Sequence, residues 1–188
     1  MTDISTYHRK TEKQFLFNVQ SNWVANNNTG TFYSNDVKAI LKVGLNNKFG
    51  GTTKEWTPEH IFLSAIGSSF MTTFMLVCEE SKCHINYFEC NIIGQVKFID
   101  DACQFTQVDV FAKIEIEDEE LKHIINETLE KTKKHCLVAH SVKSRIIYHP
   151  EVIVTTSTKN VRITIIRFAI IAVRKLNLKN TCNDKVLN

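Results

Sequence analysis

The chain has 188 residues, of which 43% are hydrophobic and 23% are charged. This composition is typical of globular proteins. The length suits one domain with a sizeable core and is too short for two domains of ordinary size. The formal net charge of +3 hides an asymmetry, because residues 156–188 carry +6 and residues 1–155 sum to −3. We therefore expect a domain over residues 1–155 and a basic C-terminal extension over residues 156–188.

The spacing of the cysteines and the composition of residues 1–13 indicate the cellular compartment of the protein. The six cysteines are irregularly spaced, and a chain of this size has no need of a disulfide framework, so reduced thiols are favoured. Residues 1–13 are polar and lack the apolar stretch of a secretory signal. These two features predict a cytoplasmic protein.

The first predicted elements are strands. Residues 14–24 alternate loosely and end in a turn-forming cluster over residues 25–30, after which residues 31–34 and 37–45 resume a strand-like composition. The pattern predicts an antiparallel meander. Residues 45–56 are rich in Gly and Asn, and a long loop of this kind is often functional.

Residues 57–81 predict one long helix. Thr57 is placed to cap the first amides, Pro58 suits the first helical position, and Glu59 suits the positive end of the helix dipole. The helix surface is small or apolar on nearly all sides, so we expect it to be covered on most sides. Serines and threonines interrupt its middle and two glutamates close it, leaving fewer apolar residues in a row than the roughly 20 that a bilayer needs.

Residues 87–99 and 104–117 alternate with period two on either side of Asp100 and Asp101, which predicts a hairpin with one wet face. The side chains expected to point inward are Val108, Val110, Ala112, Ile114 and Ile116. Those expected to point outward are Asp109, Lys113, Glu115 and Glu117.

A second, amphipathic helix should follow, capped by Asp118 and led by acidic residues. Its apolar stripe consists of Leu121, Ile124, Ile125, Thr128 and Leu129. Lys131, Lys133, Lys134 and His135 lie at its C-terminal end, as the helix dipole prefers. Residues 144–156 form the last predicted strand.

The order of elements predicts an α+β fold rather than alternating βαβ units, with a buried central helix packed against antiparallel sheet. A helix that is apolar nearly all round needs more cover than these few strands provide. We therefore expect a second subunit to supply the rest.

Two segments resemble the OsmC/Ohr family of thiol-dependent hydroperoxide reductases. They are TPEHIFLSAIGSSF on the first helix and KKHCLVAHSVKS after the second, and the resemblance covers residues 23–155. It implies an intertwined homodimer with its sites at the subunit interface. It also implies that Glu59 belongs to the site and that Cys136 is the second cysteine of the family's reactive pair.

The resemblance breaks at the first of the two reactive cysteines. Ser69 stands ten residues beyond Glu59, where the family has its peroxide-attacking cysteine. No arginine occurs between Arg9 and Arg145 to hold a thiolate ionised, and the first hairpin offers only asparagines at residues 26–28. A hydroxyl has no oxidation ladder comparable to that of sulfur, so Ser69 cannot replace the thiol.

Cys136 is therefore the main candidate for reactivity, with Lys133 and Lys134 placed to favour its thiolate and the preceding helix end opposing it. The alternative is that Cys136 is a small buried hydrophobe. Cys78 lies nine residues after Ser69 and should face roughly the opposite side of the helix.

Metal binding and serine hydrolysis are the disfavoured chemistries. Neither Cys78 with Cys83 and His84 nor Cys136 with His140 shows the paired spacing of a structural zinc site. No Gly-X-Ser-X-Gly elbow surrounds Ser69. We expect no cofactor and no metal.

The tail carries an isoleucine-rich stripe that would suit a basic amphipathic helix. Packing on the body or on a partner subunit is favoured over contact with a membrane, and no nucleic acid partner is expected.

Two functions remain open for the whole chain. One is hydroperoxide reduction in oxidative stress defence, with a thiol reductant and an activity weakened or lost through the incomplete pair Ser69 and Cys136. The other is a non-catalytic dimeric module that binds a small apolar ligand at the subunit interface.

Overall fold

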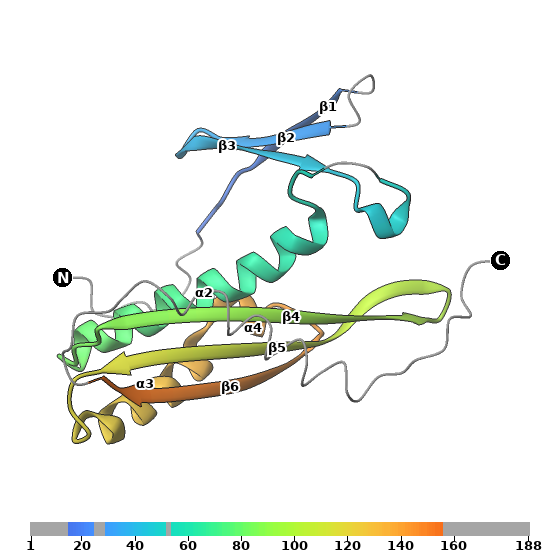
Figure 1. The fold of residues 1–188 in the computed structure, drawn as a ribbon. Helices are drawn as coiled ribbons and strands as arrows, with labels where there is room; N and C mark the ends of the chain where they lie inside the picture. The colour runs from blue at the N-terminus through green and yellow to red at the C-terminus, as the bar shows by residue number, and fades with distance from the viewer. Residues whose placement is uncertain (1–14, 25–28, 52–53, 156–188) are drawn as a thin grey trace. The chain divides into compact units, whose positions relative to one another are not determined.

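The computed structural model describes residues 15–24, 29–51 and 54–155 (Figure 1). In chain order the elements are β1 (Gln20–Val24), β2 (Thr29–Ser34), β3 (Val37–Gly44), η2 (Asn47–Phe49), α2 (Pro58–Glu80), β4 (Tyr87–Ile99), β5 (Ala102–Ile116), α3 (Leu121–His135), α4 (Leu137–His140) and β6 (Arg145–Val154). The fold is α+β, as predicted. The basic tail lies outside the described residues, so its helix and the boundary at residue 155 stay predictions.

The N-terminal meander is confirmed, with strand order β1-β2-β3 and antiparallel pairing throughout. The first strand is shorter than predicted, since it starts at Gln20 rather than at residue 14. Gln20 pairs with Tyr33, and β2 ends one residue later at Ser34. Residues before Gln20 therefore have no further strand beside them in this sheet.

The second sheet has the order β4-β5-β6. Its hairpin is confirmed at the predicted place, because Asp100 and Asp101 form the two-residue turn with φ values of 48° and 63°. Two consecutive positive φ values are typical of the type I′ turn, whose twist matches that of paired strands.

The predicted antiparallel pairing is found between β4 and β5, whereas β6 pairs with β5 in parallel, so the second sheet is mixed. Parallel neighbours need a crossover connection, and α3 and α4 provide it between β5 and β6. The chain thus contains one βαβ unit within its α+β fold.

The inward face of β5 is confirmed, with exposed fractions of at most 2% for the five predicted residues. Asp109 and Lys113 lie on the outer face of β5 as predicted, but the prediction that this face is wet is wrong at both residues, since each is only 5% exposed. The cause is the central position of β5, whose outer face is flanked by side chains of its two neighbours. Asp109 accepts a hydrogen bond from Gln107 and pairs with His149 at 2.7 Å, and Lys113 pairs with Glu115.

The long helix α2 has the predicted bounds, but its capping differs. Thr57 lies at the N-cap without capping an amide, because its hydroxyl donates to the carboxylate of Glu59 at 2.6 Å. α2 contacts β4, α3 and α4, and Gly67 allows a close approach, since a Cβ there would lie 2.4 Å from the Ile92 side chain.

Within one chain, burial of α2 is limited to one side, which agrees with the expectation that a single copy covers this helix only in part. Cover of the remaining surface by a second subunit stays a prediction. The buried residues are Ile66, Gly67, Phe70, Phe74, Val77 and Cys78. On another side Met71, Met75 and Leu76 are exposed by 39%, 39% and 45%. By length and composition alone, α2 is also the one described helix that would suffice to cross a membrane.

The helix α3 begins at Leu121, two residues after the start that capping by Asp118 predicts. Asp118 does not cap it, since its carboxylate accepts a hydrogen bond from the Glu120 amide in the turn before the helix. The predicted stripe is buried at Ile125, Thr128 and Leu129, whereas Ile124 is 36% exposed. The basic C-terminal turn is confirmed.

Candidate functional site

The two positions singled out by the sequence meet within one chain. The thiol of Cys136 donates to the hydroxyl oxygen of Ser69 at 3.3 Å, although the residues are 67 positions apart. The amide of Val138 lies 3.4 Å from the same oxygen. Cys136 is fully buried and Ser69 is partly buried, so the contact is largely shielded from water.

Local structure explains this meeting. Ser69 precedes Phe70, which anchors the buried face of α2, and this places Ser69 at the border of that face. Cys136 joins α3 to α4 in an extended conformation, with φ of −69° and ψ of 102°. The sharp turn between the two helices directs the Val138 amide, in the first turn of α4, toward Ser69.

Two ionisable groups from the sheet lie beside Cys136. Burial, followed by the neighbouring Cys136, raises the pKa of the Cys90 thiol to about 12. Burial, followed by the neighbouring Cys136 and then Cys90, raises the pKa of the Tyr148 hydroxyl to about 12. Both groups are therefore uncharged at neutral pH. Tyr148 also stacks on Phe70 at a centroid distance of 5.0 Å, which ties this group to α2.

A positive charge approaches the same region from α3. The amine of Lys133 lies 5.8 Å from the centroid of the Tyr148 ring, while it also pairs with Glu130 at 2.5 Å. His140 is engaged elsewhere, because its Nε2 lies 2.9 Å from the carbonyl oxygen of Lys134.

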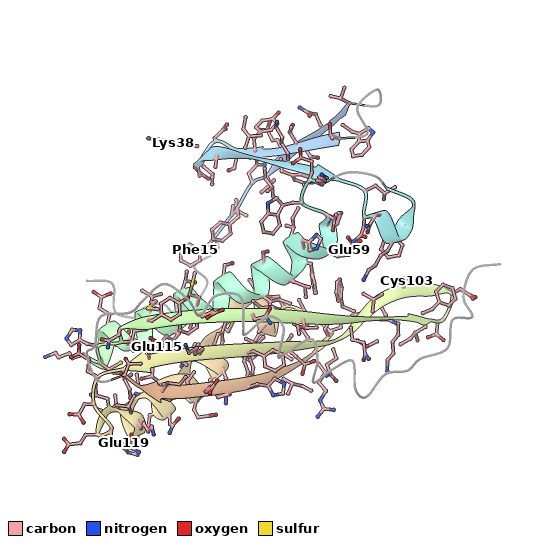
Figure 2. All side chains as sticks on the ribbon, viewed as in Figure 1. Phe15, Lys38, Glu59, Cys103, Glu115 and Glu119 are labelled. Carbon is pink, nitrogen blue, oxygen red and sulfur yellow. The ribbon has the colours of Figure 1, made fainter. Side chains whose placement is uncertain are left out.

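Glu59 occupies a separate place at the start of α2 (Figure 2). Burial acts to raise its pKa, but hydrogen bonds from Thr57, its own backbone and Asn46 outweigh burial, so the pKa lies below its usual value. The Asn46 amide donates at 3.3 Å. Ten residues of helix span about 15 Å, so the structure does not bring Glu59 to Ser69 and Cys136 within one chain.

Sequence reasoning missed three members of these two clusters, namely Asn46, Cys90 and Tyr148. Cys90 and Tyr148 carry a signal in retrospect, since each lies in register with an inward residue of β5, at Ala112 and Val110 respectively. Asn46 carries none, because its reach to Glu59 depends on the path of the loop before α2. The asparagines at residues 26–28 lie outside the described residues.

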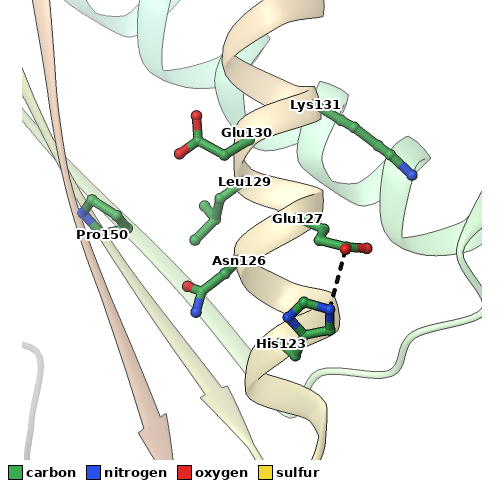
Figure 3. A pocket seen from close by; sticks show the side chains of 7 residues that line it. All are labelled: His123, Asn126, Glu127, Leu129, Glu130, Lys131 and Pro150. Carbon is green, nitrogen blue, oxygen red and sulfur yellow. Dashed lines mark ion pairs between the residues drawn. The ribbon is translucent and has the colours of Figure 1, made fainter.

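A hollow of about 510 Å³ lies elsewhere, on the surface of α3 beside β6 (Figure 3). The residues that line it are His123, Asn126, Glu127, Leu129, Glu130, Lys131 and Pro150. None of these is a predicted site residue. Across residues 15–24, 29–51 and 54–155, no three His, Cys, Asp or Glu side chains are grouped to hold a metal ion.

The fold and the site together define a class: α+β chains in which a long helix meets a cysteine that follows the crossover helix. A family model described as OsmC-like protein matches residues 51–149, more than half of the chain. The chain belongs to the OsmC-like protein family. A comparison with curated protein sequences gives no match.

Solved structures share the fold at low sequence identity. An OsmC-like protein of unknown function from Vibrio cholerae has a TM-score of 0.63 and 13% identity, covering 74% of this chain and all of its own. An OsmC-like protein from Mycoplasma pneumoniae has a TM-score of 0.61 and 14% identity, covering 75% and 98%. An organic hydroperoxide resistance protein from Elizabethkingia anophelis has a TM-score of 0.59 and 16% identity, covering 76% and 99%.

Proposed function

We propose that this chain is a cytoplasmic, peroxide-stress-related redox protein in which Cys136 is the reacting sulfur and an external thiol is the reductant. The observation that carries the proposal is the contact of 3.3 Å between the thiol of Cys136 and the hydroxyl of Ser69. In this contact a sulfur lies beside Ser69, the position at which the family resemblance predicts the peroxide-attacking cysteine. The reducing cytosol would keep that thiol available.

The chemistry needs one protein sulfur and two external thiols. The Cys136 thiolate attacks the terminal oxygen of a hydroperoxide, the O–O bond breaks, and a sulfenic acid and an alcohol form. A first external thiol displaces water from the sulfenic acid to give a mixed disulfide. A second external thiol then releases the Cys136 thiol and leaves as the external disulfide.

We expect this activity to be weak. Cys136 is fully buried, so a hydroperoxide reaches it only after local opening. The hydroxyl of Ser69 cannot form the second sulfur bond, so the oxidised state must wait for the external thiol. The neighbouring Cys90 and Tyr148 are uncharged at neutral pH and do not stabilise a thiolate by charge.

Cys136→Ser is expected to reduce organic hydroperoxide consumption in the presence of a dithiol to the uncatalysed rate, because it removes the reacting sulfur. The assay follows loss of tert-butyl hydroperoxide with purified protein. Cys103→Ser is the matched control, since Cys103 is an exposed cysteine on the β4–β5 hairpin (Figure 2) and should leave the rate unchanged. An unaltered rate in the Cys136→Ser protein would refute the assignment.

One observation favours the second candidate function, a non-catalytic module that binds a small apolar ligand. Cys136 is fully buried and its neighbours Cys90 and Tyr148 are uncharged at neutral pH, which suits contact with an apolar ligand better than formation of a thiolate. Hydroperoxide loss in wild-type protein no faster than in buffer, together with no sulfenic acid at Cys136, would favour this function.

We also propose a homodimer, in which a second copy covers the exposed side of α2. The apolar Met71, Met75 and Leu76 support this, since burying such side chains is favourable. Sedimentation should give a mass twice that of the 21.6 kDa chain. Leu76→Glu should shift the protein toward the monomer, whereas Phe98→Glu, at an exposed phenylalanine of β4, should not. A monomeric wild-type protein would refute the dimer.

A further inference from the structure

The C-terminus of α2 ends in a Schellman motif. The Cys83 amide donates to the Cys78 carbonyl at 3.0 Å, and the Lys82 amide donates to the Glu79 carbonyl at 3.2 Å. These are the 6→1 and 5→2 bonds of the motif, with Ser81 as the C-cap. Lys82 has a φ of 51°, the left-handed conformation that the motif requires.

The Schellman motif places the side chains of Cys78 and Cys83 next to each other. A Schellman motif commonly carries a contact between the residue three positions before the cap and the second residue after it. Here both of these positions are cysteines, Cys78 and Cys83. Both are buried, at 5% and 7% exposure, and both lie in the core cluster.

The Cys83 thiol affects the ionisation of Cys78. Burial, followed by a side-chain hydrogen bond with Cys83, raises the pKa of the Cys78 thiol. Both cysteines are free, so the pair holds two reduced sulfurs.

We infer that Cys78 and Cys83 are a redox pair that closes an intramolecular disulfide across the end of α2. The oxidant is a low-molecular-weight disulfide. One cysteine thiolate attacks it and releases one small thiol, leaving a mixed disulfide on the protein. The other cysteine then attacks the protein sulfur of that bond and releases the second small thiol, so two protein hydrogens are lost and one S–S bond forms.

The surroundings decide how the pair behaves. Its sulfurs are buried, but the neighbouring Glu79, Glu80, Lys82 and His84 are exposed, so opening the turn after α2 is sufficient to admit the oxidant. The protonated state of Cys78 at neutral pH makes it a poor direct nucleophile, and closure should be faster at pH 9 than at pH 7. The pair acts as a reversible lock on the end of the helix.

This inference is independent of the proposed function. Cys136 takes no part in it, and loss of hydroperoxide consumption in a Cys136→Ser protein would leave the disulfide between Cys78 and Cys83 unaffected. Hydroperoxide consumption therefore tests the proposed function, and peptide mapping tests the disulfide between Cys78 and Cys83.

Peptide mapping of the full chain tests the pair. Trypsin cleaves after Lys82, so a disulfide would join peptides 55–82 and 83–97. Because the second peptide also contains Cys90, the parent protein for the test is Cys90→Ser. After incubation with oxidised glutathione, at least half of the molecules should give the linked pair, about 2 Da lighter than the two reduced peptides together, and a reductant should release it.

Matched variants show which cysteines form the disulfide. Cys78→Ser and Cys83→Ser, each in the Cys90→Ser protein, should abolish the linked pair, and Cys103→Ser should keep it. Unlinked peptides, or a persistent glutathione adduct on one cysteine of a protein with an unchanged circular dichroism spectrum, would overturn the inference. The test does not depend on whether these variants fold, because the Cys90→Ser parent alone shows whether the two peptides are linked.

Discussion

Ser69→Cys is expected to raise organic hydroperoxide reduction at least about tenfold above the wild-type rate, because it places a second sulfur at hydrogen-bond distance from Cys136. The new thiol would attack the hydroperoxide and release an alcohol, and the Cys136 thiol would then displace water to form a disulfide. The reacting sulfur would no longer wait for an external thiol to complete the first half of the cycle.

The measurement is hydroperoxide loss with a dithiol, together with the mass of the protein after one equivalent of oxidant. Ser68→Cys is the matched control, since Ser68 is exposed and its hydroxyl bonds the Ala65 carbonyl rather than Cys136. That control should form no disulfide with Cys136. A folded Ser69→Cys protein with the wild-type rate would show that the missing arginine, or burial of the site, limits the chemistry.

Phe74→Ala should lower the free energy of unfolding by about 3–5 kcal/mol, the usual cost of removing a buried phenylalanine ring. Phe74 is completely buried, and its ring packs against Phe88 of β4 at a centroid distance of 5.0 Å. Its loss would leave a cavity between α2 and the sheet, where neither partner is free to collapse.

Urea unfolding followed by circular dichroism measures this effect. Phe98→Ala removes the same ring at a position on β4 that is 63% exposed, and it should cost less than about 1 kcal/mol. Equal losses in both variants would contradict the assignment of Phe74 to the core.

Local patterns in the sequence predict most of the elements. The bounds of α2 follow from Pro58 and its glutamate ending, and the hairpin follows from period-two alternation around two aspartates, because both signals act within a few residues. The parallel pairing of β6 could not be predicted in this way. It depends on where the chain returns after α3, and no local pattern records that path.

Burial on the outer face of β5 is a second failure of local reasoning. Alternation predicts which face a side chain occupies, but the cover on that face comes from other strands. Asp109 is buried because His149, 40 positions later, lies within 2.7 Å of it. The sequence shows two polar residues and not their pairing.

The candidate site is predicted in part. The family resemblance predicts Ser69 and Cys136 as site positions, and the two residues lie in contact in the structure. The resemblance predicts Glu59 in the same pocket, but within one chain Glu59 lies in the first turn of α2, where Thr57 and Asn46 donate hydrogen bonds to its carboxylate. A pocket shared with Glu59 therefore stays a prediction for the dimer, since only a second copy could supply that carboxylate.

Pro150 makes the two edges of the second sheet unequal in their ability to pair with a further strand. β6 is an edge strand, and Pro150 within it has no N–H to offer to a further strand. The opposite edge, β4, contains no proline and keeps a continuous series of backbone donors and acceptors. Further strands can therefore add to this sheet at the β4 edge only, so edge-to-edge growth of the sheet cannot continue into a fibre.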